Sequence, residues 1–169
     1  FSVPGSTLQR GAPYRLIVQT TKGEMLMAGT TVPGGDADTL CHAGGFDRSR
    51  DTIEFSWPDA AGARAYLVRI ETPFGPRTFF TGGTRLRLPG DLRNTDVDEL
   101  PHVFFPRFPQ AVPVSAVDSN FYDWYRSSNN SLTGAGLINR VEGGLGLFGS
   151  IVRLHLQELR VVTPQTEPV

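Results

Sequence analysis

The feature that most constrains this chain is a series of short, strand-like segments separated by turn residues. Residues 53–57, Ile-Glu-Phe-Ser-Trp, alternate apolar and polar side chains, which is typical of a strand with one buried face. Glycine- and proline-containing turns separate such segments at intervals of about 8–12 residues, which predicts an all-β antiparallel β-sandwich. The other segments of this kind are 14–19, 25–32, 65–71, 77–81, 84–88, 111–117 and 150–156.

One segment is predicted to be a short helix. Residues 120–127, Asn-Phe-Tyr-Asp-Trp-Tyr-Arg-Ser, lie in a long connection between two predicted strands and follow residues that suit a helix cap. At helical spacing Phe121, Trp124 and Tyr125 share one face, whereas Tyr122 points elsewhere.

Composition excludes several classes of protein. The net charge of −1 and the isoelectric point near 6.3 argue against a broadly basic nucleic-acid-binding domain. Cys41 is the one cysteine of the 169 residues, so no disulfide forms within the chain. No apolar segment approaches the ~20 residues that a membrane-spanning helix requires. We therefore expect no nucleic-acid partner and no transmembrane segment.

The predicted domain organisation has four parts. Residues 1–35 hold a β-hairpin, and residues 36–51 are rich in turn-forming and charged residues and are expected to be a linker. Residues 52–163 form the main β domain, with insertions at 89–110 and 118–148, and residues 164–169 are a tail. Because a lone hairpin is marginally stable in water, we interpret the first part as the end of an incomplete N-terminal β domain. The chain begins at Phe1 without a signal peptide, so we expect a mature chain whose processed N-terminus is missing.

Two groups of residues resemble a fibronectin type III-like domain. The first is Phe55-Ser56-Trp57-Pro58 followed by Tyr66-Leu67-Val68-Arg69-Ile70, and the second is the segment 112–118. The family packs a strand-B tryptophan under a strand-C tyrosine, and the segment 112–118 is similar to its strand F. The long segments 89–110 and 118–148 depart from the family pattern.

The sequence in and after the second of these segments resembles a narrower family. Residues 120–126, Asn-Phe-Tyr-Asp-Trp-Tyr-Arg, and residues 139–150, Asn-Arg-Val-Glu-Gly-Gly-Leu-Gly-Leu-Phe-Gly-Ser, are similar to the C-terminal signature of an uncharacterised family of exported bacterial lipoproteins. Its members combine an Ig-like first domain with a fibronectin-like second domain. The resemblance implies export, no known enzymatic activity and a lipid anchor upstream of Phe1.

The glycine-rich segment at residues 144–149 matches the pattern G-x-G-x-x-G. A dinucleotide-binding site requires a strand before this pattern and a helix after it, but the following residues alternate as a strand. We therefore expect a glycine-rich bend that lets the backbone pass close to the sandwich, and no cofactor.

The acidic and histidine residues do not form a convincing site. The groups Asp118, Asn120, Asp123 and Asp96, Asp98, Glu99 suggest calcium, but neither completes a calcium-binding loop. The three histidines are scattered. We expect no metal and no catalytic site, although a carboxylate pair for glycoside hydrolysis depends on three-dimensional separation.

Two aromatic groups are the candidate partner-binding residues. Tryptophan, tyrosine and arginine dominate the hot spots of protein interfaces, and both inserted segments are aromatic-rich. The alternative interpretation is a lid that covers the open end of the sandwich. The candidates are Phe121, Tyr122, Trp124, Tyr125, Arg126, Phe104, Phe105 and Phe108.

These observations predict a non-catalytic, extracytoplasmic protein that works by binding. The sharpest hypothesis is an accessory subunit on the periplasmic face of a larger membrane-protein complex, with a photosynthetic reaction-centre and light-harvesting assembly as one setting. The expected location is the periplasm or outer surface, with attachment through the partner or through a missing N-terminal anchor. The alternatives are a carbohydrate-binding or glycan-processing module, with exposed aromatics near Asp or Asn, and a structural spacer with every aromatic buried.

Overall fold

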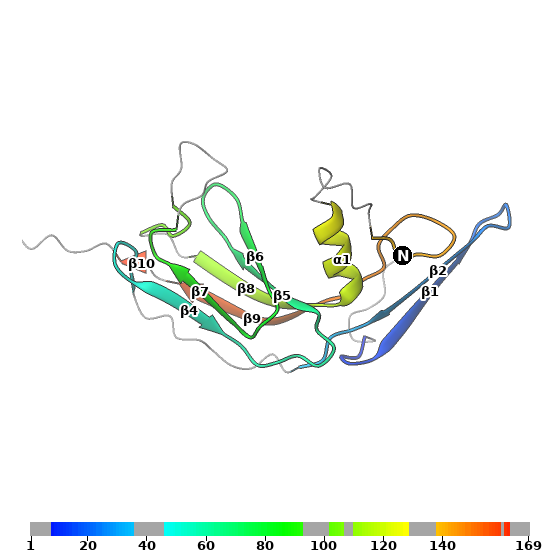
Figure 1. The fold of residues 1–169 in the computed structure, drawn as a ribbon, viewed down its shortest axis with the longest axis horizontal. Coiled ribbons are helices and arrows are strands. Elements are labelled where there is room, and N and C mark those ends of the chain that lie inside the picture. Colours follow the sequence, from blue (N-terminus) through cyan, green and yellow to red (C-terminus); the bar gives the residue numbers. More distant parts are fainter. Residues whose placement is uncertain are drawn as a thin grey trace, which may run out of the picture. The chain divides into compact units, whose positions relative to one another are not determined.

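The computed structural model describes residues 8–35, 46–92, 102–106, 110–128, 138–159 and 161–162. Strands predominate among these residues, and one short helix accompanies them. The predicted all-β class with antiparallel sheets is confirmed, and the arrangement is consistent with a β-sandwich. The elements are β1 (Pro13–Gln19), β2 (Met25–Thr31), β3 (Phe46–Asp47), β4 (Thr52–Ser56), β5 (Ala65–Ile70), β6 (Arg77–Thr81), β7 (Arg85–Pro89), β8 (Gln110–Val117), α1 (Ser119–Ser128), β9 (Ile151–Leu159) and β10 (Val161–Val162) (Figure 1).

The strands form four sheets within the described residues. A four-stranded sheet has the order β6-β5-β8-β9, and three two-stranded sheets pair β4 with β7, β1 with β2, and β3 with β10. The β1–β2 and β4–β7 pairs are antiparallel, whereas the short β3–β10 pair is parallel. The segment 46–51, predicted as the end of a linker, thus contributes a strand, and residues 36–45 and 164–169 of the predicted linker and tail lie outside the described residues.

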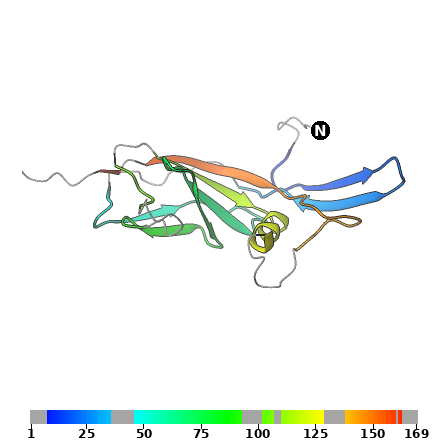
Figure 2. The ribbon, with the colours of Figure 1, turned by 90° about the horizontal axis from the view of Figure 1, so that it is seen from above.

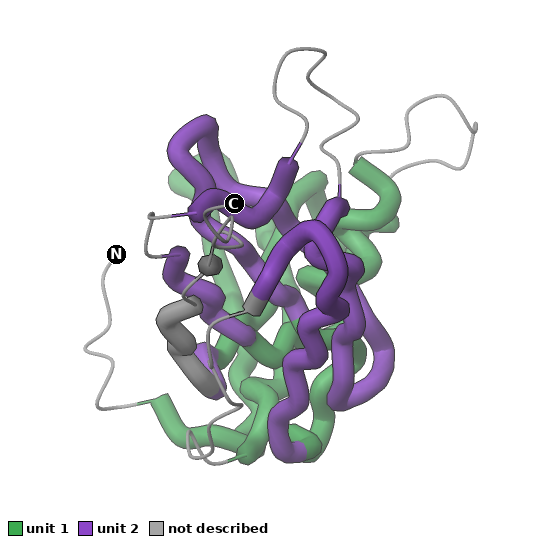
Figure 3. Tube along the Cα trace, turned by 90° about the vertical axis from the view of Figure 1, so that its left-hand side faces the viewer, with its two compact units in different colours: residues 1–36, 59–66, 115–152 green, residues 37–58, 67–114, 153–169 purple. Residues whose placement is uncertain are grey.

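The chain divides into two compact units, coloured separately in Figure 3. Unit 1 comprises residues 1–36, 59–66 and 115–152, and unit 2 comprises residues 37–58, 67–114 and 153–169. The predicted hairpin at the start of the chain therefore belongs to the same unit as helix α1.

The core of unit 2 is built from alternating residues of strands in two sheets. On β4, Ile53 and Phe55 are buried between exposed neighbours, and they pair with Leu88 and Leu86 of β7. Strands β5 and β8 of the other sheet contribute further buried residues, namely Val68, Ile70, Val112 and Val114. Inner faces with this pattern on two sheets are characteristic of a sandwich core. The predicted alternation along 53–57 and 111–117 is confirmed.

A buried glutamine fixes an irregular segment in unit 2. The side chain of Gln110, at the start of β8, is fully buried. Its Nε2 donates to the carbonyl oxygens of Glu71 (2.9 Å) and Val103 (2.8 Å), and its Oε1 accepts from the amide of Phe105 (2.9 Å). A buried amide is tolerated when its donors and acceptor are satisfied. These bonds hold residues 103–105 in place, with Phe104 fully buried among them.

In unit 1, β1 and β2 form a long antiparallel ribbon, which we call the ribbon (Figures 1 and 2). The predicted hairpin between residues 14 and 32 is confirmed. Buried and exposed residues alternate along β4, whereas every residue of β1 from Arg15 to Gln19 is exposed.

The glycine-rich segment passes close to other backbone, as predicted. Met27 of β2 and Glu142 exchange both backbone hydrogen bonds (3.0 and 2.8 Å). The next residue, Gly143, has φ +80°, and a Cβ there would collide with the carbonyl oxygen of Met25. Gly149 lies against α1, where a Cβ would sit 2.9 Å from the amide nitrogen of Phe121. A strand rather than a helix follows Gly149, since β9 begins at Ile151, so the strand–turn–helix arrangement of a dinucleotide-binding site does not occur at this segment.

Candidate functional site

Helix α1 starts at a side-chain cap that also joins it to the ribbon. Oδ1 of Asp118 accepts a hydrogen bond from the amide of Phe121 (2.8 Å), which satisfies a free donor of the first helical turn. Oδ2 of the same carboxylate accepts from the hydroxyl of Thr30 on β2. The amide group of Asn120 donates to the carbonyl oxygens of Gly29 and Phe148. The predicted helix over 120–127 and its cap are confirmed, and both the cap residue Asp118 and Asn120 also join α1 to other segments of unit 1.

The aromatic residues of α1 divide between two faces, as the helical spacing predicts. The rings of Phe121 and Tyr125 stack with centroids 6.3 Å apart and an interplanar angle of 18°. Trp124 is half-buried, and Tyr125 is exposed. Tyr122 lies apart from this stack among arginines. The four aromatic side chains of α1 are therefore half-buried or exposed, and none of them is enclosed in a core.

Two guanidinium groups lie close to the ring of Tyr122. The Cζ atoms of Arg64 and Arg126 lie 5.2 Å and 5.8 Å from the ring centroid, within the range of cation–π attraction. Arg64 precedes β5 and is exposed, and Arg126 is on the last turn of α1. The ring thus positions two arginines that come from different segments of unit 1.

A buried carboxylate joins a third arginine to the group. Asp123 is 8% exposed, and its Oδ2 accepts a hydrogen bond from Arg140, whose side chain is 52% exposed. Arg126 lies 4.0 Å from the other carboxylate oxygen, with a side chain that is 59% exposed. We name the five residues Arg64, Tyr122, Asp123, Arg126 and Arg140 the Arg–Tyr patch.

The electrostatics of the Arg–Tyr patch differ from those of the whole chain. It contains three arginines and one carboxylate, whereas the chain as a whole has a net charge of −1. Arg64 makes no ion pair among the described residues. A guanidinium presents five donors in a planar fork. The patch can therefore form paired hydrogen bonds with carboxylates on another molecule.

The structure brings together only some of the predicted site residues. Tyr122 and Arg126 belong to the Arg–Tyr patch, with Trp124 and Tyr125 on the same helix. Phe104 and Phe105 belong to unit 2, where Phe104 is fully buried and offers no surface to a partner. Phe105 packs against Phe74 with centroids 5.5 Å apart. Phe108 lies outside the described residues.

Sequence reasoning missed Arg64, Asp123 and Arg140 as members of this group. Asp123 was considered only as an oxygen ligand for calcium, and the two arginines lie in other segments of the chain. The helical spacing does place Asp123 and Arg126 within reach of each other. No local signal links Arg64 or Arg140 to the helix, because only the fold of unit 1 brings them there.

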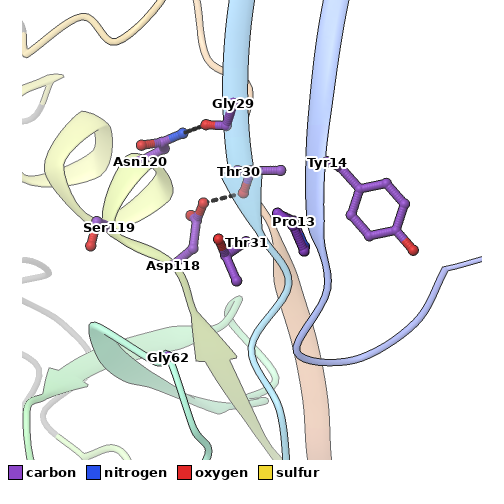
Figure 4. A pocket seen from close by; sticks show the side chains of 9 residues that line it. All are labelled: Pro13, Tyr14, Gly29, Thr30, Thr31, Gly62, Asp118, Ser119 and Asn120. Carbon is purple, nitrogen blue, oxygen red and sulfur yellow. Dashed lines mark hydrogen bonds between the residues drawn. The ribbon is translucent and has the colours of Figure 1, made fainter.

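A cavity of about 480 Å³ lies in unit 1 beside the start of α1. Asp118 and Asn120 face it, but their side chains bond to Thr30 and to Gly29, as the dashed lines in Figure 4 show. The ring of Tyr14 extends away from both of them (Figure 4). The lining residues are Pro13, Tyr14, Gly29, Thr30, Thr31, Gly62, Asp118, Ser119 and Asn120.

Neither metal nor membrane-spanning features stand out in the described part of the chain. No group of three or more His, Cys, Asp or Glu side chains there is placed to hold a metal ion. No helix there has both the length and the hydropathy to cross a bilayer.

Comparison with family models, with curated proteins and with solved structures finds no match to this chain. The coarse part of the fibronectin resemblance, a fold of antiparallel sheets consistent with a β-sandwich, agrees with the structure. The kinship with fibronectin-like domains and with exported lipoproteins stays a prediction.

Proposed function

We propose that the protein is a non-catalytic binding protein that docks on another protein through the Arg–Tyr patch. The observation that carries this proposal is the ring of Tyr122 within cation–π distance of the guanidinium groups of both Arg64 and Arg126. The ring orders two long side chains before any partner arrives. Less conformational entropy is then lost on binding, which favours affinity.

The chemistry of the patch defines the class of partner. Arginine forks bind carboxylates through two parallel, charge-assisted hydrogen bonds. Tyrosine adds a large apolar area with a polar tip. Because Asp123 neutralises one of the three arginines, the patch keeps an excess of positive charge. The partner that fits is a protein surface that presents Asp or Glu side chains around an apolar centre.

The setting follows from the sequence resemblance. A resemblance to exported bacterial lipoproteins supports an extracytoplasmic location and an accessory subunit on the periplasmic face of a membrane-protein complex. The same resemblance supports the fibronectin type III-like assignment of the main β domain. These finer assignments belong to the proposal and share its test.

The experiment is a quantitative co-purification of the tagged chain from the membranes of its source. Tyr122→Ala and Arg126→Glu remove the ring and reverse one guanidinium. Arg85→Glu, on β7 of unit 2 and 77% exposed, is the control with the same change of charge. We expect each patch variant to weaken binding of one stoichiometric partner about 10–100-fold, and the control to bind like the wild type.

The result is interpreted together with a stability measurement. Thermal unfolding of each variant within a few degrees of the wild type excludes loss of the fold as the cause. A partner retained at wild-type affinity by both patch variants would contradict docking through this surface.

A second function is favoured by the cavity beside α1. It is lined by a carboxylate, an amide and a tyrosine, which are groups of the kind that orient a small polar ligand such as a sugar. Binding of the chain to a soluble glycan, lost in Tyr14→Ala and retained in Tyr122→Ala, would support it. Because Asp118 and Asn120 already bond to unit 1 itself, we place this function second.

A further inference from the structure

We propose that a second copy of this chain pairs antiparallel with the outer edge of β1, which makes one four-stranded sheet from two ribbons. This inference uses other residues than the Arg–Tyr patch and is independent of the proposed function.

The first observation is apolar exposure on both faces of the ribbon. Three consecutive apolar residues of β1, Leu16, Ile17 and Val18, are exposed, and Ile17 is 57% exposed. Because side chains alternate between the faces of a strand, Leu16 and Val18 lie on one face and Ile17 on the other. Met25, across from Gln19 in β2, is exposed on the Ile17 face. The cover that the described residues give to the ribbon lies over β2, where Ala28 is buried and Leu26 is half-buried, and it leaves these side chains of β1 exposed on both faces.

The second observation is an open backbone edge. Thr20 donates to the carbonyl of Glu24 (2.9 Å), and the amide of Val32 donates to the carbonyl of Ala12 (3.0 Å). Hydrogen-bonded pairs alternate along an antiparallel ladder, so the even-numbered residues of β1 bond to β2. The N–H and C=O groups of Arg15, Ile17 and Gln19 therefore point away from β2. Among the described residues no other strand pairs with this edge.

The third observation is that this edge complements itself in one register. With Ile17 opposite Ile17 of the second copy, Arg15 lies opposite Gln19, and each outward amide of the three faces a carbonyl. Leu16 then lies opposite Val18 on the other face. Cross-strand apolar pairs of this kind stabilise a sheet, whereas like charges directly opposite destabilise it. Here the single charge of the strand, on Arg15, meets a neutral amide.

The neighbouring registers would form fewer hydrogen bonds between the two copies of β1. A shift of two residues in one direction brings Pro13 into the hydrogen-bonded row, where it has no N–H to donate. A shift in the other direction moves Arg15 beyond the partner strand. A twofold axis through Ile17 is thus the arrangement that uses every outward group, and closed twofold contacts are the commonest form of self-association.

The physical benefit is the completion of an unstable element. A two-stranded hairpin is marginally stable alone, whereas three or more strands with an apolar face are stable. An exposed edge with apolar residues also invites uncontrolled pairing. Pairing with a second copy removes both problems at once.

The first test measures the mass of the full chain by sedimentation equilibrium between about 1 and 300 µM. This wide range is needed because a contact along a single strand edge is small, and small interfaces are weak. We expect twice the chain mass of 18.5 kDa. Ile17→Pro removes an outward N–H but no bond to β2, so the ribbon persists while the dimer dissociation constant rises about 100-fold. Ile17→Val is the control and should dimerise like the wild type.

The second test places a cross-link on the axis. In a hydrogen-bonded antiparallel pair the facing Cα atoms are ~5.5 Å apart, within the range of a disulfide. In a Cys41→Ser background, Ile17→Cys should form covalent dimers on mild oxidation. Val18→Cys, whose opposite residue is Leu16, should form far fewer.

Three outcomes would overturn the proposal. One is a wild-type chain that stays monomeric to the highest concentration. Another is a dimer that survives Ile17→Pro and does not cross-link through position 17, which would assign association to another surface. The last is a monomer whose outward β1 amides are protected from exchange, which would assign the edge to a different segment. Tyr122→Ala and Arg126→Glu should leave the dimer intact, so the two proposals fail separately.

Discussion

Strands β1 and β4 each belong to a two-stranded antiparallel sheet, yet their burial differs. Each pairs antiparallel with a later strand, β4 with β7 and β1 with β2. Ile53 and Phe55 of β4 are buried between exposed neighbours, whereas β1 is exposed from Arg15 to Gln19.

The sequence period accounts for this difference. A strand that strictly alternates apolar and polar residues needs an apolar layer on one face only, and the core of unit 2 provides that layer for β4. The run Leu16-Ile17-Val18 has apolar side chains on both faces, so it needs cover on two sides. Continuous apolar strands are typical of sheets buried on both faces. The comparison teaches that β4 is completed within its own chain, whereas β1 requires further cover.

The largest expected effect is the loss of stability on removing a buried side chain of β4, compared with an exposed one of β1. Phe55→Ala removes a ring that is 2% exposed and should lower the free energy of unfolding by about 3–5 kcal/mol. Ile17→Ala, measured on the chain at concentrations where it is monomeric, should cost less than about 1 kcal/mol because its side chain is already in water. Urea unfolding followed by tryptophan fluorescence measures both. Equal losses would show that β1 is buried as deeply as β4.

The next effect concerns the segment that lies against α1. A Cβ at Gly149 would sit 2.9 Å from the amide nitrogen of Phe121 and 3.0 Å from Oδ1 of Asp118, so Gly149→Ala should cost about 1–3 kcal/mol. Gly146→Ala is the matched control, because its nearest contact is an ordinary 3.9 Å from Val141. Thermal unfolding compares the two variants. A neutral Gly149→Ala would mean that the close approach is not maintained.

A smaller effect tests the cap that joins α1 to the ribbon. Asp118→Ala removes the acceptor for Phe121 and for Thr30 and should cost about 1–2 kcal/mol. Asp118→Asn keeps a capping oxygen and should recover most of that stability. Helical circular dichroism and urea midpoints report the change. Identical losses in the two variants would point to the charge rather than the cap.

The smallest effect is a pH dependence on β5. Burial and the hydrogen bond to Asp59 raise the pKa of Tyr66 above its ordinary 10.0. The contribution of this tyrosine to stability is therefore complete below pH 10 and is lost as the pH rises through its folded pKa. Absorbance titration of the phenolate should show Tyr66 as a late-titrating tyrosine that disappears in Tyr66→Phe. A normal titration midpoint would contradict the buried hydrogen bond.

The sequence was sufficient for most of the fold because the fold depends on local patterns. Alternation at Ile53, Phe55 and Trp57 located a strand and its inner face, and the turn residues located the hairpins. The spacing of Phe121 and Tyr125 predicted their shared helical face. The glycine-rich segment 144–149 predicted a close approach of backbone, although not the residues that it approaches.

The remainder depends on contacts between distant segments. Nothing near Arg64 or Arg140 indicates that they meet Tyr122 and Asp123. The sequence also does not indicate the burial of Gln110 or the parallel pairing of β3 with β10, because a single polar residue and strands of two residues have no characteristic period. Phe104 was predicted as a contact residue, but it is fully buried. The residue type misled here, since an aromatic side chain is common both in a core and in an interface.

The most direct test of the difference between β1 and β4 is amide hydrogen exchange along β1 in the full chain at high concentration. The inward amides of Leu16 and Val18 bond to β2 and should be protected in any state that keeps the ribbon. Our account predicts that the outward amides of Arg15, Ile17 and Gln19 are protected as well, and that Ile17→Pro removes this protection from Arg15 and Gln19 while leaving Leu16 and Val18 protected. Rapid exchange of the outward amides in the wild-type chain would contradict it and would show that β1 is a free edge.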